Sequence, residues 1–351
     1  MSQVKLSVLD VLPVSSGSTA SSAIRHALDL ARLADARGFE RIWYAEHHGM
    51  PSIASSAPEI LIGHAAGATQ RIRVGAGGVM IPNHTPLQVV ERYRTLNTLY
   101  PDRIDLGIGR APGTDPLTSS ALRAAPGEQG ASLIAELLAF EQGGFEEGHP
   151  FARVIVTPDD SALPPVWLLG SSGSSARFAG QLGVGYAFAA HFSPTPPRPA
   201  VDAYREAFRP SSAFPDPHFI LALSVIVAET HDEAVELSSS AQVMFARMRS
   251  GVVAPVPSPE EARREGWTPA SGAGLYESMG RLLIVGTPAE VRARIEAAAL
   301  EAAADEVMVM TIVHDPTARL RSYDLLARAF GLDVGVRAAT RSGLESGNLR
   351  L

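Results

Sequence analysis

The chain has 351 residues, of which 46% are hydrophobic and 19% charged, with a formal net charge of −7 and no cysteine. The lack of cysteine excludes disulfides, thiolate metal sites, iron–sulfur clusters and cysteine nucleophiles. The negative charge without a lysine or arginine block disfavours a nucleic acid partner, and no apolar run reaches the ~18 residues that a membrane span needs.

The first third of the chain alternates short apolar runs with amphipathic segments. Met1–Lys5 leads directly into the first run instead of forming a basic-then-apolar leader, so we expect a cytoplasmic protein. The apolar runs predict four strands, over Lys5–Leu9, Arg41–Ala45, Arg73–Gly78 and Ile104–Gly109. Three helices are predicted between them: one capped by Ser21 or Ser22 and ended by Gly38, one over Glu59–Thr69, and one opened by Thr85-Pro86 and running to Leu99.

The rest of the chain continues this alternation, with one insertion after the fourth strand and one after the seventh. Four further strands are predicted, over Val166–Leu169, Tyr186–Ala189, Phe219–Val227 and Glu306–Thr311. Helices are predicted over Ala131–Glu141, Ser174–Leu182, Ala200–Phe208 and Asp232–Met248, with two more opened by Thr287-Pro288 and Asp315-Pro316, the last stopping near Gly331. Residues 250–280, rich in proline, glycine and glutamate, interrupt the repeat after the seventh strand.

Eight strands that alternate with helices predict a parallel sheet, and eight is the number that closes a (β/α)8 TIM barrel. The barrel would carry insertions after strands four and seven. An open doubly wound sheet is the alternative, but the Leu9–Ser22 turn lacks its glycine fingerprint. We therefore expect one domain over residues 1–331, with 250–280 as a lid and 332–351 as a C-terminal extension.

Two strand exits carry residues suited to an anion, and active sites of such barrels lie at these exits. Strand five exits into Gly170, Ser171, Ser172, Gly173, Ser174 and Ser175, where small residues, hydroxyls and a helix N-terminus favour a phosphate. A flexible loop with a serine helix cap is the alternative interpretation. Arg110 follows strand four directly, where it could bind a phosphate bidentately or form a surface ion pair.

Three other exits carry glycines or histidines. Gly77-Gly78 leaves room for a flat ring against the backbone, with a strained or cis peptide possible there. His47-His48 leaves strand two without H-x-H or H-E-x-x-H spacing, so one imidazole acting as acid or base fits better than a metal site. A capping or core histidine is the alternative. His191 follows strand six.

Three segments in this order and spacing resemble the bacterial luciferase-like flavin oxidoreductases. They are 41–48 with Glu46-His47-His48, 73–82, and 102–110 with Gly107-Ile108-Gly109-Arg110. The resemblance extends to Trp167–Gly183 and Val285–Pro288 and so covers roughly residues 1–330. The single-chain alkanal monooxygenase-like branch is the most similar.

The resemblance implies a flavin mononucleotide (FMN) site at the mouth of a barrel. Gly77-Gly78 matches the family's non-proline cis peptide beneath the flavin ring, and Arg110, Ser171, Ser172 and Ser174 match its phosphate-binding positions. His47 matches the catalytic histidine. Gly109 stands where some members carry a cysteine, so any role of that thiol is absent.

The implied activity is that of a two-component monooxygenase. It would use reduced FMN, supplied by a separate flavin reductase, and O2 to place one oxygen atom on a small organic substrate near His48 and His191. Light emission is not implied, and no metal is expected.

Three alternatives stay open. The barrel could bind the deazaflavin F420 for hydride transfer, store flavin without turnover, or act as a metal-dependent hydrolase through His47, His48 and His191. We also expect a homodimer, because Ala65, Ala66, Gly67 and Ala68 permit close helix approach, although packing on the chain's own sheet explains the same residues.

Overall fold

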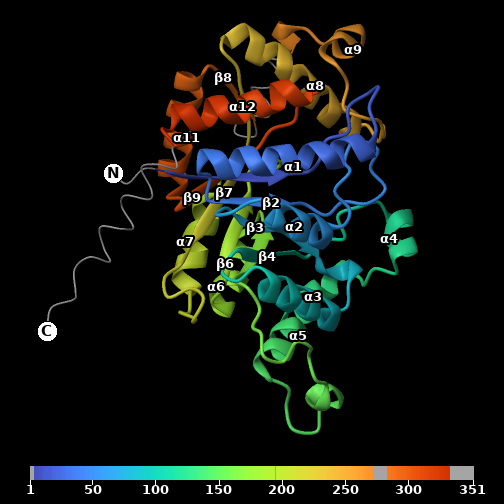
Figure 1. Ribbon diagram of the computed structural model, residues 1–351, viewed down its shortest axis with the longest axis vertical. Helices are drawn as coiled ribbons and strands as arrows, with labels where there is room; N and C mark the ends of the chain where they lie inside the picture. Colours follow the sequence, from blue (N-terminus) through green and yellow to red (C-terminus); the bar gives the residue numbers. More distant parts are fainter. Residues whose placement is uncertain (1–3, 194, 272–282, 333–351) are drawn as a thin grey trace, which may run out of the picture.

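The computed structural model describes residues 4–193, 195–271 and 283–332, and its parallel strands close into the predicted barrel (Figure 1). The barrel strands are β1 (Lys5–Asp10), β2 (Arg41–Tyr44), β3 (Arg73–Met80), β4 (Ile104–Gly109), β5 (Val166–Gly170), β6 (Gly185–Ala189), β7 (Phe219–Val227) and β9 (Glu306–Met310). Each pairs in parallel with its neighbour, and the β6–β7, β7–β9 and β9–β1 pairs complete the ring. The (β/α)8 fold predicted from the sequence is confirmed.

Helices follow the strands around the barrel (Figure 1). The longer ones are α1 (Ala20–Arg37), α2 (Pro58–Gly67), α3 (Pro86–Leu99), α5 (Gly130–Gln142), α6 (Gly173–Leu182), α7 (Arg198–Ala207), α8 (His231–Arg249), α11 (Pro288–Ala302) and α12 (Pro316–Ala329). Short ones are α4 (Pro116–Leu122), α9 (Pro259–Arg264), η1 (Ile81–Asn83), η2 (Gly127–Gln129) and η3 (Pro150–Arg153). None of the described helices combines the length and apolar character needed to cross a bilayer.

Helix ends differ from the prediction at two caps. Helix α1 is capped by the Thr19 hydroxyl instead of Ser21 or Ser22, while Gly38 ends it in the left-handed conformation as expected. The Thr85 side chain makes no capping hydrogen bond to α3. Pro86 at the first helical position has no N–H to satisfy, which reduces the need for a cap.

The insertion after β7 contains a strand that the sequence prediction missed. Strand β8 (Leu283–Gly286) pairs in parallel with Ser224–Val227, the second half of β7, outside the eight-stranded ring. Four residues are too few to show periodicity. The described part of the predicted lid, 250–271, is tied to the β1–α1 loop through the N–H of Val256, which donates to the Val14 carbonyl. Its remainder, 272–280, lies outside the described residues.

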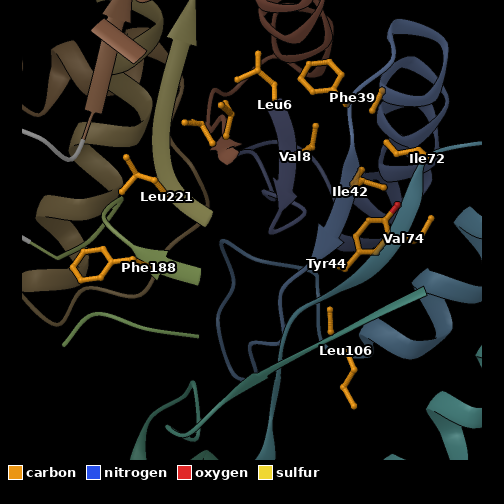
Figure 2. Packing of buried hydrophobic residues seen from close by; sticks show 14 of the residues in the cluster. Leu6, Val8, Phe39, Ile42, Tyr44, Ile72, Val74, Leu106, Phe188 and Leu221 are labelled. Atoms are coloured by element: carbon orange, nitrogen blue, oxygen red, sulfur yellow. The ribbon is translucent and has the colours of Figure 1, made fainter. Parts of the chain in front are cut away.

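Two hydrophobic layers follow from the alternation of side chains along each strand. Leu6, Val8, Ile42 and Tyr44 point outward and pack under the helices, as Figure 2 shows. The alternate positions, such as Leu9 and Trp43, point into the barrel together with residues of the opposite strands. The barrel interior is therefore a separate core, and its filling decides where a cavity can form.

Buried charges close the barrel at the N-terminal ends of its strands. Arg41 donates through Nε to Glu306 at 2.8 Å and through Nη1 to Asp105 at 2.7 Å, and Arg73 binds the other oxygen of Asp105. Burial alone would raise the pKa of Glu306, but the Arg41 charge and the adjacent His218 imidazole hold that pKa well below its usual value. These charges are paired, so this network is a structural plug.

Replacing Glu306 by glutamine should destabilise the protein by about 3–5 kcal/mol, because Arg41 would lose a buried partner. Urea denaturation at neutral pH measures the change, with the exposed Glu296→Gln as control, for which we expect less than about 0.5 kcal/mol. Because folding lowers the pKa of Glu306, its stabilisation is present above the unfolded value of about 4.3 and is lost as pH falls below it. Equal stability of wild type and Glu306→Gln would contradict this account.

Candidate functional site

A cavity of about 330 Å³ opens at the C-terminal mouth of the barrel, where chemistry was predicted. Its size lies within the ~300–1,000 Å³ typical of small-molecule sites. The predicted site residues on its wall are His47, Gly77, Gly78, Arg110, Gly170, Ser171, Ser172 and His191. His48, Gly173 and Ser174 are not on the wall, and no described residue of 250–271 is either. The structure therefore gathers most of the predicted groups, from five strand exits, around one hollow.

The hollow exists because the inward positions near the mouth are small. Ala45, Gly77, Gly109, Ala187 and Ala222 all line it. Toward the other end of the barrel, Trp43 and Trp167 meet edge to face at 5.5 Å and fill the interior. The change from aromatic to small inward side chains thus leaves space at the mouth and closes the barrel below it.

A larger hollow of about 590 Å³ lies at the opposite end, lined by Arg41, Arg73, Asp105 and His218. Arg41 is held by Asp105 and Glu306, and Arg73 is held by Asp105 and by two backbone carbonyls, so neither offers an unpaired charge to a ligand. Arg41, Arg73 and Asp105 belong to the plug described above. We therefore place the candidate site at the mouth.

Arg110 gives the mouth cavity an unpaired positive charge. The side chain is half-buried, and its guanidinium makes no hydrogen bond or ion pair with any residue in the described ranges. Burial raises the pKa of the nearby Tyr186 to about 12, and the positive charge of Arg110 opposes this rise. The surface ion pair considered from the sequence is not formed, and a free guanidinium on a cavity wall suits an anion.

Helix α6 reaches the same wall through its N-cap Ser172 and through Ser175, and its first turn offers free donors. Ser172 is its N-cap, with a capping box to Ser175, so Gly173 and Ser174 belong to the first helical turn instead of the preceding loop. Within the described chain, the backbone N–H groups of Gly173 and Ser174 have no hydrogen-bond partner. Tyr186 steadies the turn by bonding Ser175 Oγ at 2.9 Å. The arrangement combines a helix N-terminus and a cation, which is suited to phosphate.

The Gly77–Gly78 peptide bond is cis, as the resemblance implied, and both residues line the cavity. The packing reason for these glycines differs from the sequence argument. A Cβ at Gly77 would lie 2.8 Å from Leu9 Cδ1, and one at Gly78 would lie 2.8 Å from the Gly107 carbonyl oxygen. The glycines are therefore required by the protein's own packing on β1, β2 and β4. Because they have no side chain, they expose bare backbone to the cavity.

Gly78→Ala should accordingly destabilise the fold by about 1–3 kcal/mol, since the new methyl group meets the β4 backbone, which cannot rotate away. Gly173→Ala is the matched control, because a Cβ there meets nothing within 4 Å. We expect that variant to be unchanged or about 0.5 kcal/mol more stable. Thermal or urea unfolding distinguishes the two, and equal effects would refute the packing argument.

His47 lines the cavity with a defined tautomer. Its Nδ1 lies 2.9 Å from the Gly113 carbonyl oxygen, which can only accept, so Nδ1 carries the proton and Nε2 keeps a lone pair. Burial lowers the pKa of His47, against the opposing effects of the Gly113 carbonyl and the Glu46 charge. The imidazole is therefore neutral at neutral pH and able to accept a proton.

The other two predicted histidines lie in different surroundings. Burial lowers the pKa of His191 to about 4, while the Ala222 backbone opposes this shift. His48 points elsewhere and bonds Glu46 Oε1 through Nε2 at 3.0 Å, so the structure does not bring it to the substrate position predicted from the sequence. Because His48 is not on the wall with His47 and His191, the three do not form the metal site of the hydrolase alternative.

Several wall residues were missed by sequence reasoning. They are Met80 and Phe192, together with Glu46, which was noted only as part of a motif. Met80 lies over Gly109, where a Cβ would come within 2.7 Å of its sulfur. These residues are brought to the mouth only by the closed barrel, so no local pattern could have indicated them.

The small residues of α2 do not carry the dimer argument. Ala65 and Ala66 are 1% and 2% exposed and pack in the core of their own chain, which was the alternative interpretation. Gly67 is exposed. The homodimer stays a prediction without support from these alanines.

Known proteins match this chain over nearly its whole length. The family described as luciferase-like monooxygenase matches residues 4–306. A luciferase-like monooxygenase of Escherichia coli (strain K12) is 41% identical over 325 residues, 92% of this chain and 96% of that protein. The N-acetyl-S-alkylcysteine monooxygenase of Bacillus subtilis (strain 168) is 32% identical over 335 residues, 93% of this chain and 98% of that protein. The crystal structure of apo-MsnO8 has a TM-score of 0.85 at 41% identity and covers 94% of this chain and 98% of its own.

More distant proteins share the fold with named ligands or partners. The oxygenating constituent of 3,6-diketocamphane monooxygenase in complex with FMN has a TM-score of 0.68 at 18% identity, covering 93% of this chain and 97% of that one. An F420-dependent secondary alcohol dehydrogenase with an F420-acetone adduct has a TM-score of 0.64 at 17% identity, covering 93% and 99%. The oxygenase component of the flavin-dependent trigonelline monooxygenase of Acinetobacter baylyi is 22% identical over 310 residues, 81% of this chain and 82% of that protein.

Proposed function

Because the chain belongs to the luciferase-like monooxygenase family, we propose that it is the oxygenase of a two-component system that uses reduced FMN and O2. One observation carries the proposal. Arg110 and the α6 N-cap Ser172 line the same cavity as His47 and the Gly77-Gly78 peptide. A phosphate and a flat ring joined by a short chain match this arrangement of cation, helix N-terminus and bare backbone.

The residues divide the work of holding FMN. The phosphate would be bound by the Arg110 guanidinium, by the N–H groups of Gly173 and Ser174, and by the hydroxyls of Ser171 and Ser172. The ring would lie against Gly77 and Gly78. Gly170 lets the serine turn fold onto Tyr186, because a Cβ there would lie 2.2 Å from Ser175 Oγ. Reduced FMN supplies the electrons with which O2 is activated.

His47 is the proposed catalytic group. Its Nε2 lone pair can take up a proton from the reacting atoms and return it, while Gly113 holds the other nitrogen protonated. The small organic substrate would enter beside His191 and Phe192, which line the same cavity. The apolar wall, including Leu9, Met80 and Met308, keeps water from the reacting atoms.

The supply of reduced FMN by a separate flavin reductase belongs to the same proposal, and the name of the trigonelline oxygenase component supports it by analogy. The cytoplasmic location, the homodimer and the single domain over 1–331 stay predictions. Residues 333–351, which contain nearly all of the predicted extension, lie outside the described residues.

The decisive experiment compares cofactors. The purified protein is titrated with FMN, reduced FMN and reduced F420, and O2 consumption is followed after each reduced cofactor is added with a substrate panel. We expect reduced FMN to bind and to consume O2 with formation of an oxygenated product. Tight binding of reduced F420 without O2 consumption would reject the monooxygenase proposal and favour the hydride-transfer alternative. Flavin binding with an activity that His47→Ala leaves unchanged would rule out the proposed role of His47.

A further inference from the structure

The Glu46 carboxylate is fully buried at the point where three strand exits meet. His48 Nε2 and Asn83 Nδ2 donate to its Oε1 at 3.0 and 2.9 Å. The Met80 N–H donates to Oε2 at 2.9 Å, and His84 Nε2 lies within 3.0 Å of both oxygens. Burial acts to raise the pKa of Glu46, but the bonds from His84, Asn83 and His48 hold it below its usual value. The carboxylate is therefore a charged acceptor whose oxygens are already in use.

Asn83 extends this cluster to the next loop. Its Nδ2 donates both to Glu46 Oε1 and, at 3.0 Å, to the Pro112 carbonyl. Its Oδ1 is buried without a partner among the described residues, so the two donor bonds alone orient the amide. A flipped amide would set its oxygen against two acceptors, which fixes the assignment.

The loop that Asn83 contacts contains both the proposed phosphate ligand and the hydrogen-bond acceptor of His47. Arg110 begins it, and the Gly113 carbonyl accepts the proton of His47 Nδ1. Gly113 has a φ of 68°, and a Cβ there would lie 3.0 Å from the Met80 side chain and 3.1 Å from the Glu46 carbonyl oxygen. Residues 110–113 are therefore pressed onto the Glu46 cluster, and a shift of this loop would move a phosphate ligand and a histidine partner together.

We propose that Glu46 and Asn83 are positioning residues that hold loop 110–113 so that it fixes the tautomer of His47 and the place of Arg110 at the same time. The part concerning Arg110 rests on the proposed function, whereas the part concerning His47 does not. Glu46 itself acts through Asn83. A second tie, from Thr114 Oγ1 to the His48 carbonyl at 2.6 Å, keeps the loop attached when Asn83 is removed.

The test uses Asn83→Ala and Glu46→Gln in the full-length protein. Asn83→Ala removes only the link, and Glu46→Gln keeps the shape of the side chain but replaces an acceptor by a donor. The tautomer of His47 is measured by nitrogen and carbon NMR of labelled imidazoles without any cofactor. FMN affinity is measured by quenching of flavin fluorescence. We expect wild-type His47 to be protonated at Nδ1, both variants to show a mixture of tautomers, and FMN affinity to fall about tenfold.

Glu306→Gln is the matched control, because it removes a buried carboxylate at the other end of the barrel. It should lower stability but leave the His47 tautomer and FMN affinity as in wild type, which separates positioning from general loosening. If Glu46→Gln fails to fold, Asn83→Ala still decides the matter. A wild-type tautomer in the folded variants overturns the proposal. If the wild-type protein does not bind FMN, the proposed function is overturned instead. The tautomer of His47 in the variants then still tests whether Glu46 and Asn83 position loop 110–113.

Discussion

Replacing Arg110 by alanine should weaken FMN binding about a hundredfold. The guanidinium has no partner in the described chain, so its donors are available to a phosphate on the cavity wall. Two charge-assisted hydrogen bonds lost at about 1.5 kcal/mol each give about 3 kcal/mol, which is about a hundredfold in affinity. Titration of the protein with FMN, followed by flavin fluorescence, measures the change.

Riboflavin, which lacks the phosphate, provides the control for this result. Wild type should bind riboflavin much more weakly than FMN, and Arg110→Ala should not weaken riboflavin binding further. Arg177, on α6 but 3.8 Å from Glu206 and exposed, is the matched arginine, and its alanine variant should bind FMN as wild type does. If Arg110→Ala lowers the affinities for FMN and riboflavin equally, Arg110 does not bind the phosphate.

Replacing His47 by alanine should lower turnover by about 10²–10⁴, the usual contribution of a general acid or base, while FMN binding stays unchanged. The His47 imidazole lines the cavity but is not one of the groups proposed to bind the phosphate. Product formation is measured with reduced FMN, O2 and any substrate that wild type oxygenates. The activity of wild type should also fall with decreasing pH, because His47 becomes protonated. This fall should occur below a pH of about 6.5, the ordinary pKa of a histidine, because burial lowers the pKa of His47.

His64→Ala is the control, since this exposed imidazole on α2 lies outside the cavity. It should keep full activity and the wild-type pH profile. If His47→Ala retains wild-type turnover, or if it loses FMN binding to the same degree as turnover, the proton-transfer role of His47 is refuted.

The sequence predicted the barrel, and it predicted that the candidate residues gather at one mouth, because both follow from short-range patterns. Apolar runs of four to nine residues alternate with helical periodicity, and parallel strands put all their exits at one mouth. Arg110 and Gly170 could thus be brought together although they are far apart in the chain. Strand β8 escaped prediction because four apolar residues have no period to detect.

The details of the site could not be predicted, because they depend on contacts between distant residues. The bond from His47 to Gly113 spans 66 residues, and the bond from Asn83 to Pro112 spans 29. His48 was assigned to the substrate although adjacent residues leaving a strand point in different directions, and the structure sets it on Glu46. The reason for Gly78 is its contact with the β4 backbone, which no local pattern contains.

A crystal structure of the protein with bound FMN tests the central claim most directly. The account predicts that the phosphate accepts hydrogen bonds from the Arg110 guanidinium and from the N–H groups that begin α6, with the ring against Gly77 and Gly78 and beside His47. A phosphate bound away from Arg110, or a ring outside the mouth cavity, would contradict it.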